Sequence, residues 1–294
     1  MDNYKVTELI KELQDGVRSY LNSETYTTWL TAVARFHNYS INNILLILRQ
    51  NPQATQVASY RTWRSLGCQV KKGEHGIKVL VPTPVKVRRE MGDMDMDEEE
   101  KMIMHFKIGH VFDISQINGE LPDAGIRELQ GTVPEFARFL DAAKAISPVP
   151  VRFDSHLDGE AKGYFSPYEK EIVIRAGMAE EQSAKTILHE MAHAVMHAEG
   201  EGHSADRAAK EVQAESVAYI CSRALFGMDS GDYSFGYIGT WSSRDTKELM
   251  NSLKEIKDTA SLLIVRFREY WGREEKVQTE RDDSFFRLNA SGLL

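Results

Sequence analysis

Two histidines four residues apart, with a glutamate directly after the first, stand in the segment KTILHEMAHAVMH, residues 185–197. On an α-helix, His189 and His193 share a face and can direct both imidazoles to one point. Glu190 can then lie over the open side of a bound metal ion and take a proton from water. The flanking residues within 186–195 are uncharged and include no proline, as expected for a ligand helix in a core. The pattern predicts a hydrolytic metal site, with zinc favoured and manganese or cobalt as alternatives.

A third candidate ligand follows in DRAAKEVQAESVAYICSRAL, residues 206–225. Glu211 and Glu215 lie one helical turn apart beside an apolar face, where a carboxylate is costly to bury unless a cation pairs with it. We predict Glu211 as the third ligand and Glu215 as the acceptor of a ligand histidine's free ring N–H. The reversed assignment, and two solvated glutamates on a surface helix, are the alternatives. His197 and His203 are further candidates, as ligands or as histidines beside the site.

The hydrophobic period changes along the chain, from helical spacing near the N-terminus to β-branched runs and back. The strands GIKVLVPTPVKV (76–87) and MIMHFKIGHVFDI (102–114) predict a long hairpin around an acidic connection. Ser40 can cap a short helix that Asn51–Pro52 ends. Further strands are expected in VRFDS and GYFSPYEKEIVIR, helices over 3–22, 24–36, 134–146, 180–198, 204–226 and 244–271, and a frayed tail from Gly272.

The fold class expected from this order is α+β in two domains, which suits a chain of 294 residues. A segment rich in glycine, proline and charge, 117–135, marks the boundary. We predict an N-terminal domain of helices and a β-hairpin over 1–125, with an acidic loop at 90–101. A metal-binding domain over 126–228 and a loop with a helical extension over 229–294 complete the chain.

The formal net charge of −8 conceals a basic N-terminal half, because residues 29–90 hold ten Lys or Arg against two Glu. Basic residues alternate there with aromatic ones, a combination that suits single-stranded nucleic acid, where cations follow phosphates and rings stack on bases. The alternative is that Trp63 belongs to the core and the cations to a solvated face. The candidate DNA contacts are Arg35, Tyr39, Arg61, Trp63, Arg64, Lys71, Lys72 and Lys78.

Cys68 and Cys221 show no paired spacing and are expected to be reduced, buried thiols. The N-terminus lacks the apolar core of a signal peptide, and the longest apolar run is too short to span a bilayer. These features indicate a cytoplasmic protein with no membrane partner.

The segment from about 150 to 226 resembles the gluzincin-type metallopeptidases, in particular the ImmA/IrrE-like group, through KEIVIRAG, LHEMAHAVMH and EVQA. The resemblance implies a zincin-like fold, with His189, His193 and Glu211 as zinc ligands and Glu190 as general base. It implies hydrolysis of a protein or peptide substrate, held by backbone pairing to an edge strand that we place near 170–175. Such enzymes also use a Tyr or His to stabilise the oxyanion, and Tyr168 and Tyr164 are the candidates.

The basic half resembles the N-terminal domain of ArdC-type antirestriction proteins of conjugative plasmids and transposons. The matching blocks are YSINNILLIL, SYRTWRSLGCQVKKGEHGIKVLVP and VFDISQ, within residues 36–122. The resemblance implies single-stranded DNA binding ahead of a metallopeptidase-like domain, and a role in protecting incoming DNA during conjugation. The acidic insertion and the final helix have no counterpart in that pattern. The alternative function is a DNA-binding protein whose metal site is structural or inactive and which acts as an interaction module in conjugative transfer.

Overall fold

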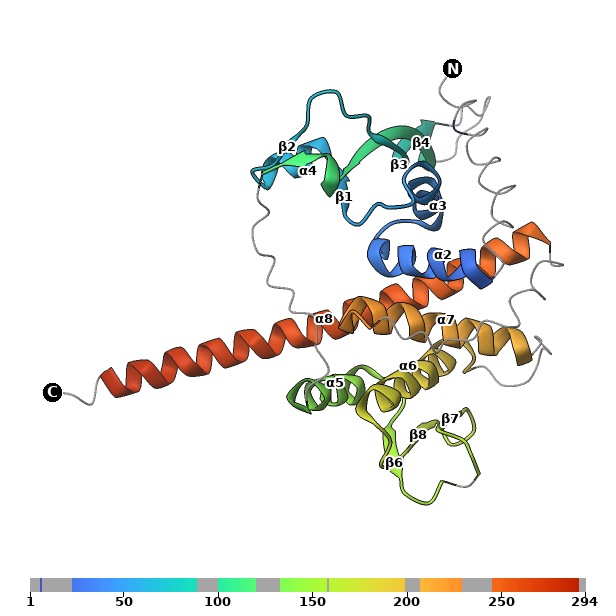
Figure 1. Ribbon diagram of the computed structural model, residues 1–294, viewed down its shortest axis with the longest axis vertical. Coiled ribbons are helices and arrows are strands. Elements are labelled where there is room, and N and C mark those ends of the chain that lie inside the picture. Colours follow the sequence, from blue (N-terminus) through green and yellow to red (C-terminus); the bar gives the residue numbers. More distant parts are fainter. Residues whose placement is uncertain are drawn as a thin grey trace, which may run out of the picture. The chain divides into compact units, whose positions relative to one another are not determined.

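The computed structural model describes Val6 and residues 23–88, 100–119, 133–157, 159–198, 207–228 and 245–290. The chain forms two compact units. Unit 1 comprises Met1–Ile126 with Asp245–Met250, and unit 2 comprises Arg127–Arg244 with Asn251–Leu294. Both units mix helices and strands, so the α+β class is confirmed (Figure 1). The predicted domain limits at 125 and 228 stay predictions.

Two helices form the apolar core of unit 1. Helix α2 covers Ser23–Phe36 and α3 covers Ile41–Gln50. The predicted cap is confirmed, because the Ser40 side chain accepts a hydrogen bond from the backbone N–H of Asn43. In α2, Tyr26 and Trp29 are fully buried and stack with ring centroids 5.6 Å apart. The apolar face of α2 and α3 therefore becomes core, as the sequence predicts.

The predicted hairpin of unit 1 is also confirmed. Strand β3, Ile77–Arg88, pairs antiparallel with β4, Glu100–Asp113, and β4 pairs on its other side with β1, Val57–Ser59. Strand β1 was not predicted, and neither were four further elements. They are the helix α4, Tyr60–Ser65, the strands β2, Gln69–Val70, and β5, Ile117–Asn118, and the 3₁₀ turn η2, Ile114–Gln116.

The outer edge of β3 is closed by side chains of α3. Asn43 donates to the Leu80 carbonyl at 3.0 Å and accepts from the Leu80 N–H at 2.7 Å. Gln50 makes the same pair of hydrogen bonds with Lys78, both at 2.9 Å. Farther along, Pro82 has no N–H to offer a neighbouring strand. These contacts fix α3 on the hairpin and protect the edge from pairing with another chain.

Unit 2 is built on a three-stranded sheet. The strands are β6, Val151–Asp154, β7, Gly163–Ser166, and β8, Glu171–Arg175, in the order β6-β8-β7. Strand β6 is parallel to β8, and β7 is antiparallel to it. Helix α6, Glu180–Met196, packs on β7 and β8 with one side and on α7, Arg207–Phe226, with the other (Figure 1).

Two more helices complete unit 2. Helix α5 covers Val133–Ile146, and α8 covers Thr246–Ala290, of which the part from Asn251 onward belongs to unit 2. Phe267 of α8 stacks on Phe139 of α5, with ring centroids 5.3 Å apart. The Cys221 thiol of α7 donates to the Ala260 carbonyl of α8 at 3.8 Å. Helix α8 continues through Gly272, so the predicted frayed tail from that residue is wrong.

Several predictions fall outside the described residues: most of the helix at 3–22, the tip of the acidic loop, most of the boundary segment and His203. Cys68 and Cys221 are both free and buried, as predicted. Among the described helices, none combines the length and apolar character needed to cross a membrane.

Candidate metal centre

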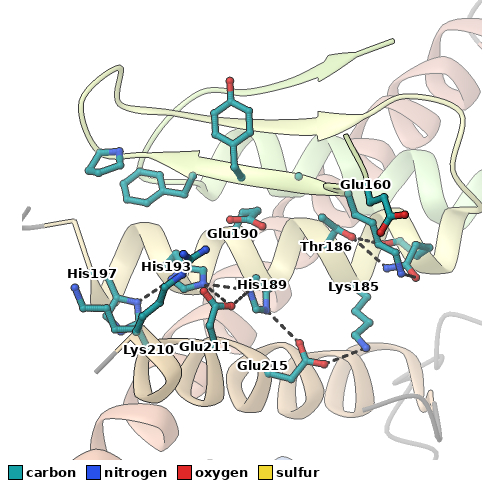
Figure 2. A pocket seen from close by; sticks show the side chains of 17 residues that line it. Glu160, Lys185, Thr186, His189, Glu190, His193, His197, Lys210, Glu211 and Glu215 are labelled. Atoms are coloured by element: carbon teal, nitrogen blue, oxygen red, sulfur yellow. Dashed lines mark hydrogen bonds and ion pairs between the residues drawn. The ribbon is translucent and has the colours of Figure 1, made fainter. Parts of the chain in front are cut away.

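Helix α6 presents the predicted histidines and glutamate from the middle of unit 2. Gly163 lets β7 approach this helix closely, since a Cβ at that position would come within 2.8 Å of Thr186 Cγ2. Leu188 and Met191 are fully buried and hold the opposite side of the helix in the core. His189 and His193 are then left to face α7, one turn apart (Figure 2).

Three donor atoms converge between α6 and α7. His189 Nε2 lies 3.1 Å from His193 Nε2, and Glu211 Oε2 lies 3.4 Å from the first and 3.7 Å from the second. Four ligands around zinc at about 2.0–2.1 Å have donor separations of about 3.3–3.4 Å. The three side chains therefore fit three corners of a tetrahedron around a divalent metal ion, and their nitrogen and oxygen donors suit one.

Glu215 lies one turn beyond Glu211 and reaches the other side of His189. Its Oε2 is 3.2 Å from His189 Nδ1, and its Oε1 is 3.1 Å from Lys185 Nζ. Burial opposes ionisation of Glu215, but His189 and Lys185 outweigh this and lower its pKa. Burial would likewise lower the pKa of His189, but Glu211 and Glu215 raise it to about 9. The imidazole is thus surrounded by groups that favour a cation.

Glu190 is buried on the sheet side of the same helix. Burial raises the pKa of its carboxyl group, and the nearby imidazoles of His189 and His193 oppose this effect. The backbone N–H of Phe165 on β7 has a smaller effect on this pKa, in the same direction as the imidazoles. A carboxylate with a raised pKa beside a metal site is suited to accept a proton.

These side chains line a pocket of about 720 Å³ that also reaches β7. His189, Glu190, His193 and Glu211 all face it, so the structure brings the predicted catalytic and ligand residues into one cavity (Figure 2). The pocket also includes two cations of α7 that sequence reasoning missed, Arg207 and Lys210.

The candidate DNA contacts divide into exposed and structural side chains. Five cations are exposed: Arg61, Arg64, Lys71, Lys72 and Lys78. Arg35 is exposed and donates to the Ala54 carbonyl, and the half-buried Tyr39 donates to the Val57 carbonyl.

The structure corrects the assignment of Trp63. Its side chain is fully buried, and its indole N–H donates to the Phe112 carbonyl at 2.8 Å. No ring face is left for a base, so Trp63 is a core residue. The aromatic side chain exposed on the same short helix is Tyr60, with 49% of its surface accessible. Tyr60 belongs to the basic and aromatic stretch noted in the sequence but is not among the candidate contacts, because the helix around it was not predicted.

Comparisons with known proteins identify both halves. Residues 3–112 match the model of the N-terminal domain of anti-restriction factor ArdC, and residues 149–221 match the IrrE N-terminal-like domain. The two matched domains together are those of an ArdC-type antirestriction protein.

Two solved structures share the fold of this chain, and one curated relative matches most of its length. Two crystal structures of the antirestriction ArdC protein from the R388 plasmid have a fold similar to that of this chain. Its metal-free form gives a TM-score of 0.53 at 23% identity, covering 79% of this chain and 86% of that one. Its Mn(II)-bound form gives 0.56 at 22% identity, covering 87% and 97%. The uncharacterized protein pXO2-81 of Bacillus anthracis is 25% identical over 88% of this chain, which spans about half (51%) of that relative.

One expectation drawn from the peptidase resemblance needs correction. Strand β8 pairs on both sides, so the segment near 170–175 is not an edge, and β7 is the edge strand beside the pocket. Tyr164 follows Gly163 on β7 and is among the residues that line the pocket. Tyr168 is 95% exposed and does not line the pocket. The oxyanion role of either tyrosine stays a prediction.

Proposed function

We propose that unit 2 is a zinc-dependent peptidase, that unit 1 binds single-stranded DNA, and that together they protect the incoming DNA of a mobile element. The main support for the peptidase activity is the spacing of the donor atoms of His189, His193 and Glu211. Each pair of these atoms lies 3.1–3.7 Å apart. A site built only for structure has no need of a buried carboxylate at Glu190, which lies beside these donors.

The residues around the pocket divide the chemical work. A divalent ion bound there would polarise a carbonyl and lower the pKa of a coordinated water. Glu190, whose pKa is raised by burial, can accept a proton from water at its carboxylate and later return it to the leaving amine. The edge strand β7 can hold an extended peptide by backbone hydrogen bonds along one wall of the pocket.

Replacing the base separates chemistry from binding. We expect Glu190→Gln to keep the metal content of the wild type and to lower the cleavage of a fluorogenic peptide library about 10²–10⁴-fold. Glu181→Gln, an exposed change on the same helix, is the matched control. Cleavage that survives in Glu190→Gln would exclude Glu190 as base. A metal-loaded wild type that cleaves no peptide would favour the alternative of a DNA-binding protein with a structural metal site.

The DNA-binding half is supported by the exposed cations of unit 1. Arg61 and Arg64 lie one turn apart on α4, with the exposed Tyr60 at its start. Lys71 and Lys72 follow in the turn after β2, where Gly73 adopts a positive φ of 90°. Guanidinium and ammonium groups can follow phosphates, and an exposed phenol ring can stack on an unpaired base.

The test measures how oligonucleotide binding depends on salt concentration and on the side chain of Tyr60. Replacing Arg61, Arg64, Lys71 and Lys72 together by Ala should weaken binding to a fluorescent oligonucleotide and reduce the salt slope by about 0.7 per lost phosphate contact. Tyr60→Ala should cost about 1–3 kcal/mol without changing that slope. Lys144→Ala, an exposed cation of unit 2, is the control. An unchanged slope in the fourfold variant would remove this surface from the proposal.

A further inference from the structure

His193 is in contact through both of its ring nitrogens. Its Nε2 faces the candidate metal position, 3.1 Å from His189 Nε2, and its Nδ1 lies 3.0 Å from Nδ1 of His197 (Figure 2). A neutral imidazole carries one proton, and a nitrogen that binds metal must be the one without it. His193 can therefore serve as a ligand through Nε2 only if Nδ1 holds the proton and finds an acceptor.

His197 begins a chain of hydrogen bonds that leads away from the pocket. Its Nε2 lies 3.0 Å from Oε1 of Gln213 on α7. The Gln213 amide nitrogen donates in turn to Glu255 Oε2 on α8 at 3.2 Å. Three helices of unit 2, α6, α7 and α8, thus contribute to one line of contacts that ends on a carboxylate.

The carboxylate sets the direction of every bond in this chain. Glu255 can only accept, so the NH₂ group of Gln213 points toward it and the amide oxygen points toward His197. His197 must then donate from Nε2, which leaves its Nδ1 as an acceptor. Only a proton on His193 Nδ1 satisfies that acceptor, and the lone pair of His193 is left on Nε2.

We propose that His197, Gln213 and Glu255 are positioning residues that fix the tautomer of His193 and hold its Nε2 ready for the metal. The inference rests on the proposed metal site and deepens it. His189 has a direct carboxylate partner in Glu215, whereas His193 is served by a relay of three side chains. Glu255 lies beyond residues 149–221, the part that matches the IrrE-like model, so α8 contributes to the metal centre from outside that domain.

Zinc affinity tests the relay with matched substitutions. His197→Leu and Gln213→Met should each raise the Kd for Zn²⁺ about tenfold or more, measured by competition with a chromophoric chelator. His197→Gln should stay near the wild type, because its amide can accept from His193 and donate to Gln213. Glu255→Ala should weaken binding, whereas Glu269→Ala, an exposed change on the same helix, should not. Wild-type affinity in both His197→Leu and Gln213→Met would overturn the relay.

A second measurement needs no variant of the relay. Ring ¹⁵N spectra of the metal-free wild type should show His193 as the Nδ1–H tautomer and His197 as the Nε2–H tautomer. An Nε2–H tautomer at His193 would overturn the proposal even if a substituted chain fails to fold.

His193→Ala separates failure of the relay from failure of the site. Loss of Zn²⁺ binding in this variant, with wild-type affinity in the relay variants, would reject the relay alone. Retained binding in His193→Ala would reject the metal site, and the relay with it.

Discussion

Asp113 organises the turn that follows the long hairpin of unit 1. Its buried carboxylate accepts hydrogen bonds from the backbone N–H groups of Thr55 at 2.8 Å, Gln56 at 3.1 Å and Ser115 at 3.0 Å, and from the Ser115 hydroxyl. Gln116 completes a capping box with it. Burial alone would raise the pKa of Asp113, but these hydrogen bonds outweigh it and lower the pKa. The folded structure therefore stabilises the ionised carboxylate of Asp113.

We expect Asp113→Asn to destabilise unit 1 by about 2–3 kcal/mol at pH 7, because an amide cannot replace a carboxylate that accepts several bonds. The folded pKa lies below the unfolded value of about 3.9, so this stabilisation is present above that pH and is lost as the pH falls through the folded pKa. The difference between the urea unfolding midpoints of the two proteins should shrink below about pH 4.

Asp141→Asn, an exposed change on α5, provides the control for removing one negative charge. Equal midpoints for wild type and Asp113→Asn at pH 7 would contradict the structural role. A difference that stays constant down to pH 2 would contradict the electrostatic explanation.

The predictability of single residues depended on whether their neighbours are local. His189, Glu190 and His193 follow from helical spacing alone, and Glu211 follows from one further helix. Their roles stay predictions, although the structure brings the donors together. The partner Glu255 lies 42 residues from Gln213 and has no local signal. For the same reason, Trp63 was predicted as a DNA contact although it is buried and Tyr60 is exposed. Only tertiary packing decides which ring of α4 is buried.

Helices and strands were predictable where the sequence marks their ends. Helix α3 begins at the Ser40 cap and ends before Pro52, and the long runs of β3 and β4 carry a clear strand period. Short elements such as α4 and β5 have too few residues for a period. The order of strands is also absent from the sequence, so β8 was mistaken for an edge although its fully buried Ile172 and Val173 occupy the centre.

The contact between β7 and α6 gives a test at Gly163. A Cβ there would lie 2.8 Å from Thr186 Cγ2 and 2.9 Å from the Val173 carbonyl oxygen, so β7 must move away from the helix. We expect Gly163→Ala to destabilise unit 2 by about 1–3 kcal/mol. The movement of β7 would also displace the wall of the pocket that faces Glu190, which should reduce peptide cleavage. Calorimetry and the peptide assay measure the two effects.

Gly272→Ala is the matched control for this substitution. Gly272 lies within α8, and a Cβ there meets nothing within 4 Å. Alanine is favoured over glycine in a helix interior by about 0.8–1 kcal/mol, so the control should be neutral or stabilising. If Gly163→Ala and Gly272→Ala change the stability equally, a Cβ at position 163 does not destabilise the contact between β7 and α6.

The whole chain joins two units of different character. The basic segment 29–90 falls within unit 1, and the donors of the candidate metal centre fall within unit 2. Each unit has its own core, around Trp29 and Trp63 in the first and around Phe139 and Phe267 in the second. The proposed activities use no residue in common. A change at one site is therefore expected to leave the other site intact.

Metal removal tests this separation. An ion that binds only the folded state adds about 2.7 kcal/mol of stability at a hundredfold excess over Kd, so a chelator should lower the melting temperature of unit 2 in zinc-loaded protein. Glu211→Ala should melt at the same temperature with and without the chelator, because its donor set is incomplete. The affinity for a fluorescent single-stranded oligonucleotide, measured by anisotropy in the same samples, should not change. A loss of DNA affinity on chelation would instead mean that metal binding in unit 2 is coupled to the DNA surface of unit 1, by an amount equal to the change in binding free energy.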